Sequence, residues 1–205
     1  MDIKAHWEKI YREKKTDQLS WYQRYAHLSR TLIESIASDK GAFIIDIGGG
    51  ASVLVDDLMV AGYRNLTILD LSEYALENSK KRLGEAADTV IWKVANVLDA
   101  GLPDQAFDVW HDRAVFHFFI SGEEQRRYID GVRKALAPGG HVVIATFAEN
   151  GPPSCSGMKI QRYSPQTLCA VFGDEFRLIH SVREVHLTPD GRPQDFIYGV
   201  FRMLA

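Results

Sequence analysis

A short apolar run that ends in three glycines constrains the fold of this chain more than any other feature of its sequence. Residues 42–47 read Ala-Phe-Ile-Ile-Asp-Ile, and Gly48, Gly49 and Gly50 follow directly. An apolar run of this length, bounded by turn residues, is typical of a strand buried on both faces of a parallel sheet. Glycines at its end let the backbone turn sharply and let a ligand approach the main chain. The run therefore predicts the first strand of an α/β sheet and a ligand-binding turn after it.

Strand-like and helix-like patterns alternate along the rest of the chain. Further strands are predicted at residues 66–70, 89–94, 107–111 and 141–147, and helices at 53–61, 72–83, 121–136 and 164–171. Two β-type runs, 176–187 and 195–201, are joined by Thr-Pro-Asp-Gly-Arg-Pro, which favours an antiparallel hairpin. The alternation predicts a Rossmann-like, doubly wound α/β sheet of seven strands, mostly parallel, with a C-terminal antiparallel hairpin.

Two amphipathic helices are expected before the first strand, at residues 3–15 and 21–37. The second is expected to stop near the Asp-Lys-Gly sequence at 39–41. We therefore predict an N-terminal helical cap over residues 1–40 and a ligand-binding domain over residues 41–205.

Composition and charge exclude several other classes of protein. The chain has 205 residues, of which 46% are hydrophobic, enough for one ordinary core. Its net charge of −3 supplies no general attraction to nucleic acid. Cys155 and Cys169 lack the paired spacing of a thiolate metal site, and no apolar stretch approaches the ~18 residues of a membrane span. Because the N-terminus is charged where a signal peptide would be apolar, we expect a soluble cytoplasmic protein. The cysteine spacing adds the expectation that it holds no metal.

Asp70 closes the second predicted strand about 20 residues after the glycine turn. A carboxylate at this position can accept hydrogen bonds from both hydroxyls of a ribose, because the carboxyl ends of neighbouring parallel strands meet at one edge of the sheet. Gly48 and Gly50 match the first two glycines of a dinucleotide-binding loop, but Val53 replaces the third. The turn and Asp70 therefore predict a bound nucleoside and disfavour a nicotinamide dinucleotide.

In their order along the chain, these motifs resemble those of the class I S-adenosylmethionine-dependent methyltransferases. That family's first motif, an acidic residue two positions before Gly-x-Gly, is matched by Asp46, Gly48 and Gly50, with Ser52 in place of the usual third glycine. The resemblance extends from residue 43 to 204 and includes Leu-Ala-Pro-Gly-Gly at 136–140. It implies that S-adenosylmethionine is the cofactor. The residues expected to bind it are Asp46, Gly48, Gly49, Gly50, Asp70, Leu71, Asn96, Val97, Asp112 and Trp21.

Within that set, the resemblance assigns Asp70 to the ribose hydroxyls and Leu71 to the side of the adenine ring. Asn96 stands where the family often has an aspartate, and its side-chain carbonyl can accept a hydrogen bond from the adenine amino group. The aromatic face of Trp21 can shield the sulfonium by cation–π attraction, or it can simply pack its helix onto the domain.

The loop after the fourth predicted strand, residues 111–119, is where we expect the chemistry. Methyl transfer from a sulfonium requires a nucleophile held at attack distance and, where the nucleophile carries one, removal of a proton. Asp112 is the first candidate for orienting the acceptor or taking its proton, and His117 is the second. Each has a structural alternative: Asp112 can cap a helix or pair with Arg113, and His117 can be a buried, hydrogen-bonded histidine.

A small molecule is the expected methyl acceptor, because no large inserted recognition domain is visible and the candidate lid segments are short. A protein lysine is the alternative, since Ser-Trp-Tyr at 20–22 and Asp-Arg-Ala-Val at 112–115 resemble the methyltransferase-like protein lysine methyltransferases, which carry an Asp-Lys-Gly-Thr-type motif. Nucleic acid is disfavoured, because the asparagine-proline-aromatic motif is absent after the fourth strand. An NAD(P)-dependent oxidoreductase and a non-catalytic cofactor-binding domain are the remaining hypotheses.

Overall fold

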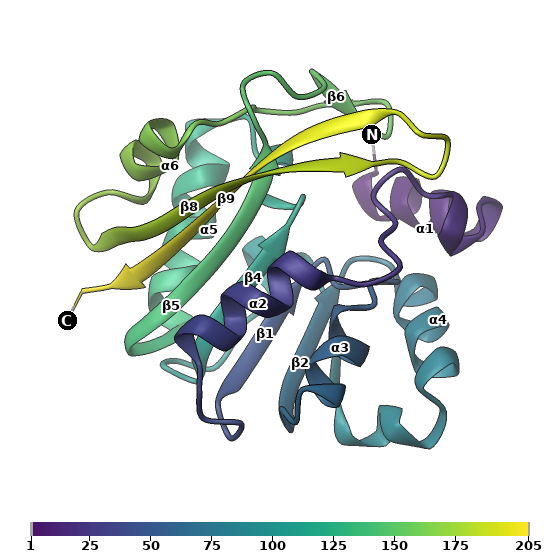
Figure 1. The fold of residues 1–205 in the computed structure, drawn as a ribbon, viewed down its shortest axis with the longest axis horizontal. Coiled ribbons are helices and arrows are strands. Elements are labelled where there is room, and N and C mark those ends of the chain that lie inside the picture. Colours follow the sequence, from purple (N-terminus) through teal and green to yellow (C-terminus); the bar gives the residue numbers. More distant parts are fainter. Residues whose placement is uncertain (1, 205) are drawn as a thin grey trace.

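The computed structural model describes residues 2–204, and within them a seven-stranded sheet is flanked by helices (Figure 1). The helices are α1 (Ile3–Glu13), α2 (His27–Ile36), α3 (Leu54–Val60), α4 (Glu73–Leu83), α5 (Gly122–Ala135) and α6 (Pro165–Phe172). The strands are β1 (Phe43–Ile47), β2 (Asn65–Asp70), β3 (Ile91–Val94), β4 (Phe107–Arg113), β5 (Leu136–Phe147), β6 (Ser154–Cys155), β7 (Met158–Lys159), β8 (Phe176–Leu187) and β9 (Pro193–Met203). Short 3₁₀ turns are η1 (Thr16–Gln18), η2 (Gly84–Thr89), η3 (Val97–Asp99) and η4 (Phe116–Phe118).

The strand order in the sheet is β3-β2-β1-β4-β5-β9-β8. The pairs from β3 to β5 are parallel, and β9 is antiparallel to both β5 and β8. The chain winds outward from β1 to β3 and then returns to β4, so the winding direction changes between β1 and β4. At such a switch point the loops separate and leave a crevice above the carboxyl ends of the strands. The predicted fold class is confirmed.

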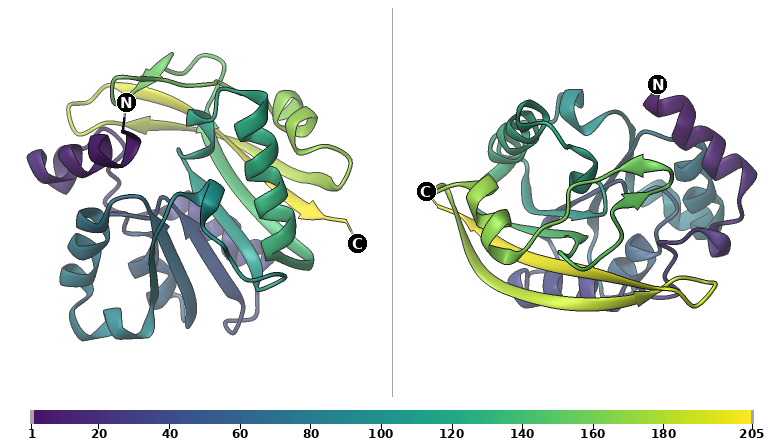
Figure 2. Two further views of the ribbon diagram at one scale, coloured as in Figure 1. Left: turned by 180° about the vertical axis from the view of Figure 1, so that it is seen from behind. Right: turned by 90° about the horizontal axis from the view of Figure 1, so that it is seen from above.

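Helices cover both faces of the sheet, as the two further views show (Figure 2). On one face, Leu32 of α2 packs in a core with Ile44 of β1. On the other, Tyr128 of α5 packs in a core with Ile45 of β1. Neighbouring β1 residues point to opposite faces, and Ile44 and Ile45 are 1% and 0% exposed. Burial on both faces is the physical reason that this strand is apolar almost throughout.

Three of the predicted helices begin at serines, Ser72, Ser121 and Ser164, which cap the observed helices. The Ser72 side chain accepts from the Ala75 N–H and begins α4. Ser121 forms a reciprocal capping box with Glu124 at the start of α5. Ser164 caps α6, which has proline at its first position. These caps are local interactions, which is why the sequence predicts them well.

The predicted helix over residues 21–37 is wrong in its first third. Residues 21–26 are irregular, and α2 begins only at His27. The backbone there forms tertiary hydrogen bonds instead: the Trp21 carbonyl accepts from Arg113, and the Ser20 carbonyl lies 2.8 Å from His186 Nε2. Contacts to two distant strands thus outweigh the local helical pattern.

Several strand predictions differ from the structure in length; for example, β9 runs from Pro193 to Met203, two residues beyond the predicted range at each end. β3 begins at Ile91, because η2 continues to Thr89. β4 runs two residues past the predicted end, to Arg113, and β5 begins at Leu136, with a register shift opposite Phe107 and Val109. The small β6–β7 hairpin, which pairs Ser154 with Lys159 and Cys155 with Met158, lies between β5 and α6, where no strand was predicted.

The two N-terminal helices pack against different parts of the molecule. α2 shares a core with the sheet, whereas α1 lies beside α4 at the edge where β2 ends (Figure 1). Within residues 2–204, none of the helices has the length and apolar character needed to cross a membrane. The cytoplasmic location and the domain boundary at residue 40 stay predictions.

Candidate functional site

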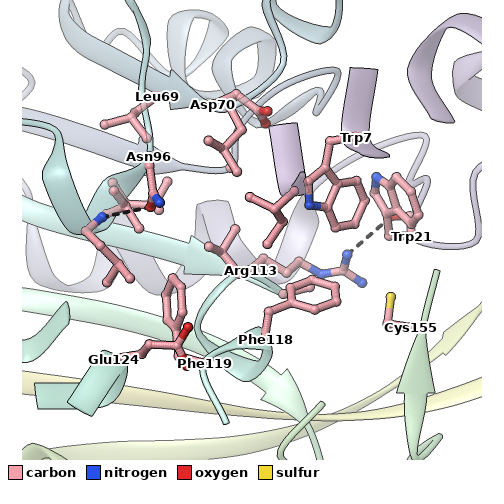
Figure 3. A pocket seen from close by; sticks show the side chains of 18 of the residues that line it. Trp7, Trp21, Leu69, Asp70, Asn96, Arg113, Phe118, Phe119, Glu124 and Cys155 are labelled. Carbon is pink, nitrogen blue, oxygen red and sulfur yellow. Dashed lines mark hydrogen bonds between the residues drawn. The ribbon is translucent and has the colours of Figure 1, made fainter. Parts of the chain in front are cut away.

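A cavity of about 350 Å³ lies above the carboxyl ends of β1, β2 and β4 (Figure 3). Residues of α1 and Trp21 form one wall of the cavity, and residues near the ends of several strands form the rest. Its lining is Ile3, Trp7, Tyr11, Trp21, Ile47, Gly48, Leu69, Asp70, Leu71, Ala95, Asn96, Val97, Leu98, Arg113, Ala114, Val115, Phe118, Phe119, Glu124, Phe147, Cys155, Gln194 and Phe196. The cavity therefore occupies the switch point of the sheet, where this type of fold binds ligands.

Gly48 and Gly50 stand where a side chain would collide with the site. Gly48 has a φ of +67°, and a Cβ added there would lie 2.1 Å from Val115 Cγ2. A Cβ added at Gly50 would lie 2.5 Å from an oxygen of Asp70. The Gly48 N–H donates to the Leu69 carbonyl at 2.7 Å, which fixes the turn to the end of β2. The glycines thus bring the main chain close to the cavity and leave room for a ligand against it.

Asp70 lines the cavity at the end of β2. One of its oxygens accepts from the Ser72 N–H at 2.8 Å. Burial raises the pKa of the Asp70 carboxyl to about 7, with a further contribution from the nearby Asp46 charge, although the Ser72 hydrogen bond opposes the shift. Such a carboxylate is short of partners for its charge, and the two hydroxyls of a ribose would supply them.

Leu71, Asn96 and Val97 line the cavity together with Asp70. The Asn96 side-chain carbonyl accepts the Leu98 N–H at 3.0 Å and caps η3. It therefore offers only its second lone pair to a ligand. The residues predicted for the ribose and the adenine are thus brought together at one end of the cavity, which we call the nucleoside end.

Asp46 lies in a small adjoining cavity, which Gly49 also lines. Its carboxylate is 2.6 Å from His111 Nδ1, and His111 Nε2 is 2.9 Å from the Ser29 hydroxyl. All three side chains are buried. The chain of contacts fixes the Asp46 carboxylate beside the glycine turn. Gly50, in contrast, lines neither cavity, and its role is to allow the close approach of Asp70.

Asp112 does not line either cavity, and the geometry favours its structural alternative, a cap. Its carboxylate accepts from the Val115 N–H at 2.9 Å, the Phe116 N–H at 3.1 Å and the Tyr128 hydroxyl at 2.6 Å. The side chain is 0% exposed, and burial raises its pKa to about 6. The expected role of Asp112 in orienting the acceptor is not supported, because β4 points this side chain toward α5.

His117 is also buried, as its structural alternative requires. Its Nδ1 accepts from the Phe147 N–H at 3.4 Å, and Nε2 has no hydrogen-bond partner within residues 2–204. Burial lowers the pKa of His117 to about 3, and the Arg113 charge acts in the same direction. A histidine that holds a proton so weakly and lies outside the cavity lining is a poor proton acceptor.

The other half of the cavity, which we call the aromatic end, is built from residues far apart in the sequence. Trp7 lies edge-on to Trp21 and Phe118, with ring centroids 5.7 and 5.3 Å apart. Phe147 and Phe196 add a further edge-to-face pair. Trp21 was predicted as a site residue, whereas Trp7, Phe147, Gln194 and Phe196 were not. The aromatic stripe of residues 3–15 was the only signal for Trp7, and the others depend on the β5–β9 pairing.

Arg113 lines both cavities and is the charged residue of the aromatic end. It follows Asp112 in β4, so its side chain leaves the opposite face of the strand. Its ion-pair partner is Glu184 of β8, at 3.6 Å, and not the predicted alternative partner Asp112. Within residues 2–204, no group of three or more metal-ligating side chains is close enough together to hold a metal ion.

Comparison with known proteins adds sequence evidence to this geometry. Residues 45–144 match the family model described as "Methyltransferase domain". An "eEF1A lysine and N-terminal methyltransferase" of Danio rerio is 28% identical over 148 residues, which cover 70% of this chain and 21% of that protein. The "Ubiquinone/menaquinone biosynthesis C-methyltransferase UbiE" of Roseobacter denitrificans is 25% identical over 167 residues, 78% of this chain and 65% of that protein. The chain thus spans about a fifth of the eEF1A relative that it matches.

Solved structures share the fold over nearly the whole chain. The 1,6-didemethyltoxoflavin-N1-methyltransferase of Burkholderia thailandensis was solved with bound 1,6-didemethyltoxoflavin and S-adenosylhomocysteine. It has a TM-score of 0.78 at 16% identity, and the match covers 99% of this chain and 88% of that one. The N-methyltransferase NodS of Bradyrhizobium japonicum, solved with S-adenosylhomocysteine, has a TM-score of 0.67 at 19% identity and 86% coverage of both chains.

Proposed function

This chain belongs to the class I S-adenosylmethionine-dependent methyltransferases, and we propose that it transfers a methyl group from S-adenosylmethionine to a small-molecule acceptor. The observation that supports this most directly is the division of one cavity into a nucleoside end and an aromatic end. A cofactor with its nucleoside beside Asp70 would extend past the glycine turn toward the aromatic end. An acceptor would then meet it in a space walled by apolar side chains.

The size and shape of the cavity support a small acceptor. Pockets for small molecules span roughly 300–1,000 Å³, and this one is near the lower limit at about 350 Å³. The same space must hold both reactants. An acceptor that fills the remainder is therefore small.

The residues of this chain would act by binding, orienting and excluding water. When bound, S-adenosylmethionine supplies an electrophilic methyl group on a sulfonium. Trp7, Trp21 and Phe118 would surround the reacting centre with aromatic faces and edges, which attract a cation and keep water out. The bond from the acceptor to the methyl carbon would form as the carbon–sulfur bond breaks toward sulfur, and an acceptor proton would be released to bulk solvent with the product. Most of the acceleration would thus come from holding the acceptor in line.

Calorimetric titration with S-adenosylhomocysteine, beside NAD and NADP, tests the cofactor before any acceptor is known. We expect S-adenosylhomocysteine to bind and both dinucleotides to fail, because Val53 occupies the place of the third dinucleotide-loop glycine. Binding of NAD or NADP alone would support the oxidoreductase hypothesis. Binding of S-adenosylhomocysteine without turnover on a broad acceptor panel would instead support a non-catalytic cofactor-binding domain.

A protein lysine is the second candidate acceptor, and the names of several relatives support it. The Danio rerio and Mus musculus relatives, 28% and 24% identical, are each named "eEF1A lysine and N-terminal methyltransferase". Incubating a cell extract with the enzyme and methyl-labelled S-adenosylmethionine, and then separating macromolecules from low-mass compounds, distinguishes the candidates. We expect label in the low-mass fraction. Label on lysine in the protein fraction would favour the second candidate.

A further inference from the structure

The guanidinium of Arg113 is held in one position at the aromatic end. Its Nε donates to the Tyr198 hydroxyl at 3.0 Å, and Nη1 donates to the Trp21 carbonyl at 3.2 Å. Its carbon lies 4.3 Å from the centroid of the Phe196 ring. The side chain is only 10% exposed. A guanidinium fixed in this way loses little conformational entropy when it binds a ligand.

One nitrogen of this group is left without a hydrogen bond. Within residues 2–204, Arg113 Nη2 is buried and has no hydrogen-bond partner. Glu184 approaches it at 3.6 Å, which supplies partial charge compensation but is too long for a hydrogen bond. The Gln194 side-chain carbonyl, another lining residue, is buried and unpartnered as well. Buried polar groups without partners are costly, so a ligand that satisfies them gains affinity.

Other charges are absent from this end of the described cavity lining. Of the other charged lining residues, Asp70 belongs to the nucleoside end, and Glu124 is engaged in the capping box of α5. Burial raises the pKa of the Cys155 thiol to about 11, so this neighbour is neutral (Figure 3). A cationic acceptor would therefore meet Arg113 with no free carboxylate to offset the repulsion.

We infer that Arg113 and Gln194 form an acceptor subsite for a small, flat molecule that presents an acidic oxygen, such as a carboxylate or an enolate, to the guanidinium. The aromatic side chains around it favour a flat molecule, because they offer faces and edges for stacking. Gln194 would accept a hydrogen bond from an N–H or O–H beside the acidic group. The inference rests on the proposed function, and it names the class of acceptor.

The test uses three probes of similar size and different charge: benzoate, benzamide and benzylamine. Each is titrated into the protein saturated with S-adenosylhomocysteine, and binding is followed by the fluorescence of the tryptophans and by calorimetry. We expect benzoate to bind at least about tenfold more tightly than benzylamine, with benzamide between them. Equal or tighter binding of benzylamine, or no binding of benzoate, overturns the inference.

A pair of matched variants assigns the preference to Arg113. Arg113→Gln should abolish the preference for benzoate, whereas Arg183→Gln, which changes an exposed arginine of β8, should retain it. If the Arg113 variant does not fold, the ranking of the three probes on the unaltered protein still decides the outcome. A preference that survives in folded Arg113→Gln overturns the inference.

The methionine carboxylate of the cofactor is another source of the same chemistry, and a further titration separates the two. S-adenosylhomocysteine carries that carboxylate, and 5′-methylthioadenosine does not. We expect Arg113→Gln to leave the affinity for both within about threefold of the unaltered protein. A loss confined to S-adenosylhomocysteine assigns Arg113 to the cofactor and overturns the acceptor subsite. Failure of the unaltered protein to bind S-adenosylhomocysteine at all contradicts the proposed function instead.

Discussion

Asp70 and Asp112 are both buried carboxyl groups at strand ends, yet their partners give them different roles. Asp70 lines the cavity, whereas Asp112 accepts hydrogen bonds from the loop behind β4 and from α5. A sequence shows that each position is acidic. The direction of the side chain decides whether the acid meets a ligand or the protein itself.

Replacing Asp112 with asparagine tests the capping role. The Tyr128 hydroxyl would lose its charged acceptor inside the core, and we expect the free energy of unfolding to fall by about 1–3 kcal/mol. The affinity for S-adenosylhomocysteine should change less than about twofold. Chemical denaturation and calorimetry measure the two quantities, with Asp130→Asn on the exposed face of α5 as the control. An unchanged stability combined with lost turnover would restore Asp112 as a catalytic candidate.

The raised pKa of Asp70 predicts how binding depends on pH. The ionised carboxylate accepts hydrogen bonds from ribose hydroxyls better than the protonated form does, and the pKa of this group is about 7. The affinity for S-adenosylhomocysteine should therefore be constant above pH 8 and fall by up to about tenfold per pH unit below pH 7. Asp70→Asn should bind weakly at every pH, with no such slope. A slope that persists in this variant would assign the titration to another group.

The raised pKa of Asp70 has the opposite effect on the ligand-free protein: ionisation of this carboxyl group lowers the stability of the fold. Because the pKa of Asp70 is higher in the folded state than the ordinary value of 3.8, the folded protein holds this proton more tightly than the unfolded chain does. The contribution of Asp70 to stability therefore falls as the pH rises from about 4 to about 7. At pH 8, Asp70→Asn should be more stable by about 1–3 kcal/mol. Thermal unfolding at pH 5 and pH 8 measures this, and a gain that is equal at both pH values contradicts the assignment.

At the scale of the secondary-structure elements, α1 acts as a wall of the site and also as a cap for α4. Glu8 Oε1 accepts the Glu73 N–H at 2.8 Å, which satisfies a backbone donor in the first turn of α4. Arg12 lies over the Tyr74 ring at 5.9 Å. These contacts hold the Trp7 side of α1 over the cavity. Because Tyr11 is the one buried residue of α1, contacts with α4 fix this helix more than burial in a hydrophobic core does.

Trp7→Ala tests whether α1 contributes to binding. Removing the indole opens the wall between Trp21 and Phe118, and we expect the dissociation constant for S-adenosylhomocysteine to rise by about three- to tenfold. Trp92→Ala, which removes an indole outside the cavity lining, is the control and should leave that constant unchanged. Equal increases of the dissociation constant in the two variants would show that the loss of affinity reflects a general loss of stability, and not the removal of the Trp7 wall.

At the scale of the whole molecule, the site joins both ends of the chain. The Gln23 amide donates to Glu184 at 3.2 Å, and the Ser20 carbonyl contacts His186 at 2.8 Å, so the segment before α2 is fixed to β8. α2 shares a core with the sheet. A ligand in the cavity therefore stabilises the N-terminal segment, the sheet and the C-terminal hairpin together.

We expect a single unfolding transition that ligand shifts as a whole. At a free S-adenosylhomocysteine concentration of a hundred times its dissociation constant, the stabilisation is about 2.7 kcal/mol, or roughly 5–10 °C in Tm for a domain of this size. Scanning calorimetry with and without ligand measures the shift. Two transitions, of which only one responds to ligand, would instead support an independent unit at residues 1–40.

The sequence by itself determines the strands, the helix caps and the nucleoside end. Buried strands of a parallel sheet are apolar on both faces, and caps such as Ser72 act within three residues, so both are local properties. Gly48, Asp70 and Asn96 lie at the carboxyl ends of three different strands, and parallel strands bring these ends to one edge of the sheet. This half of the site could be predicted because strand order and direction are enough to assemble it.

Only the tertiary structure decides the aromatic end and the roles of Asp112 and Arg113. Near its end β4 carries polar side chains on both faces, Asp112 on one and His111 and Arg113 on the other. The sequence therefore cannot tell which of two neighbouring residues points into the cavity. The pairing of Phe147 with Phe196 depends on the register between β5 and β9, which are separated by some 45 residues of chain. Long-range register and the position of α1 are set by packing, and packing brings Trp7, Arg113 and Gln194 to one place.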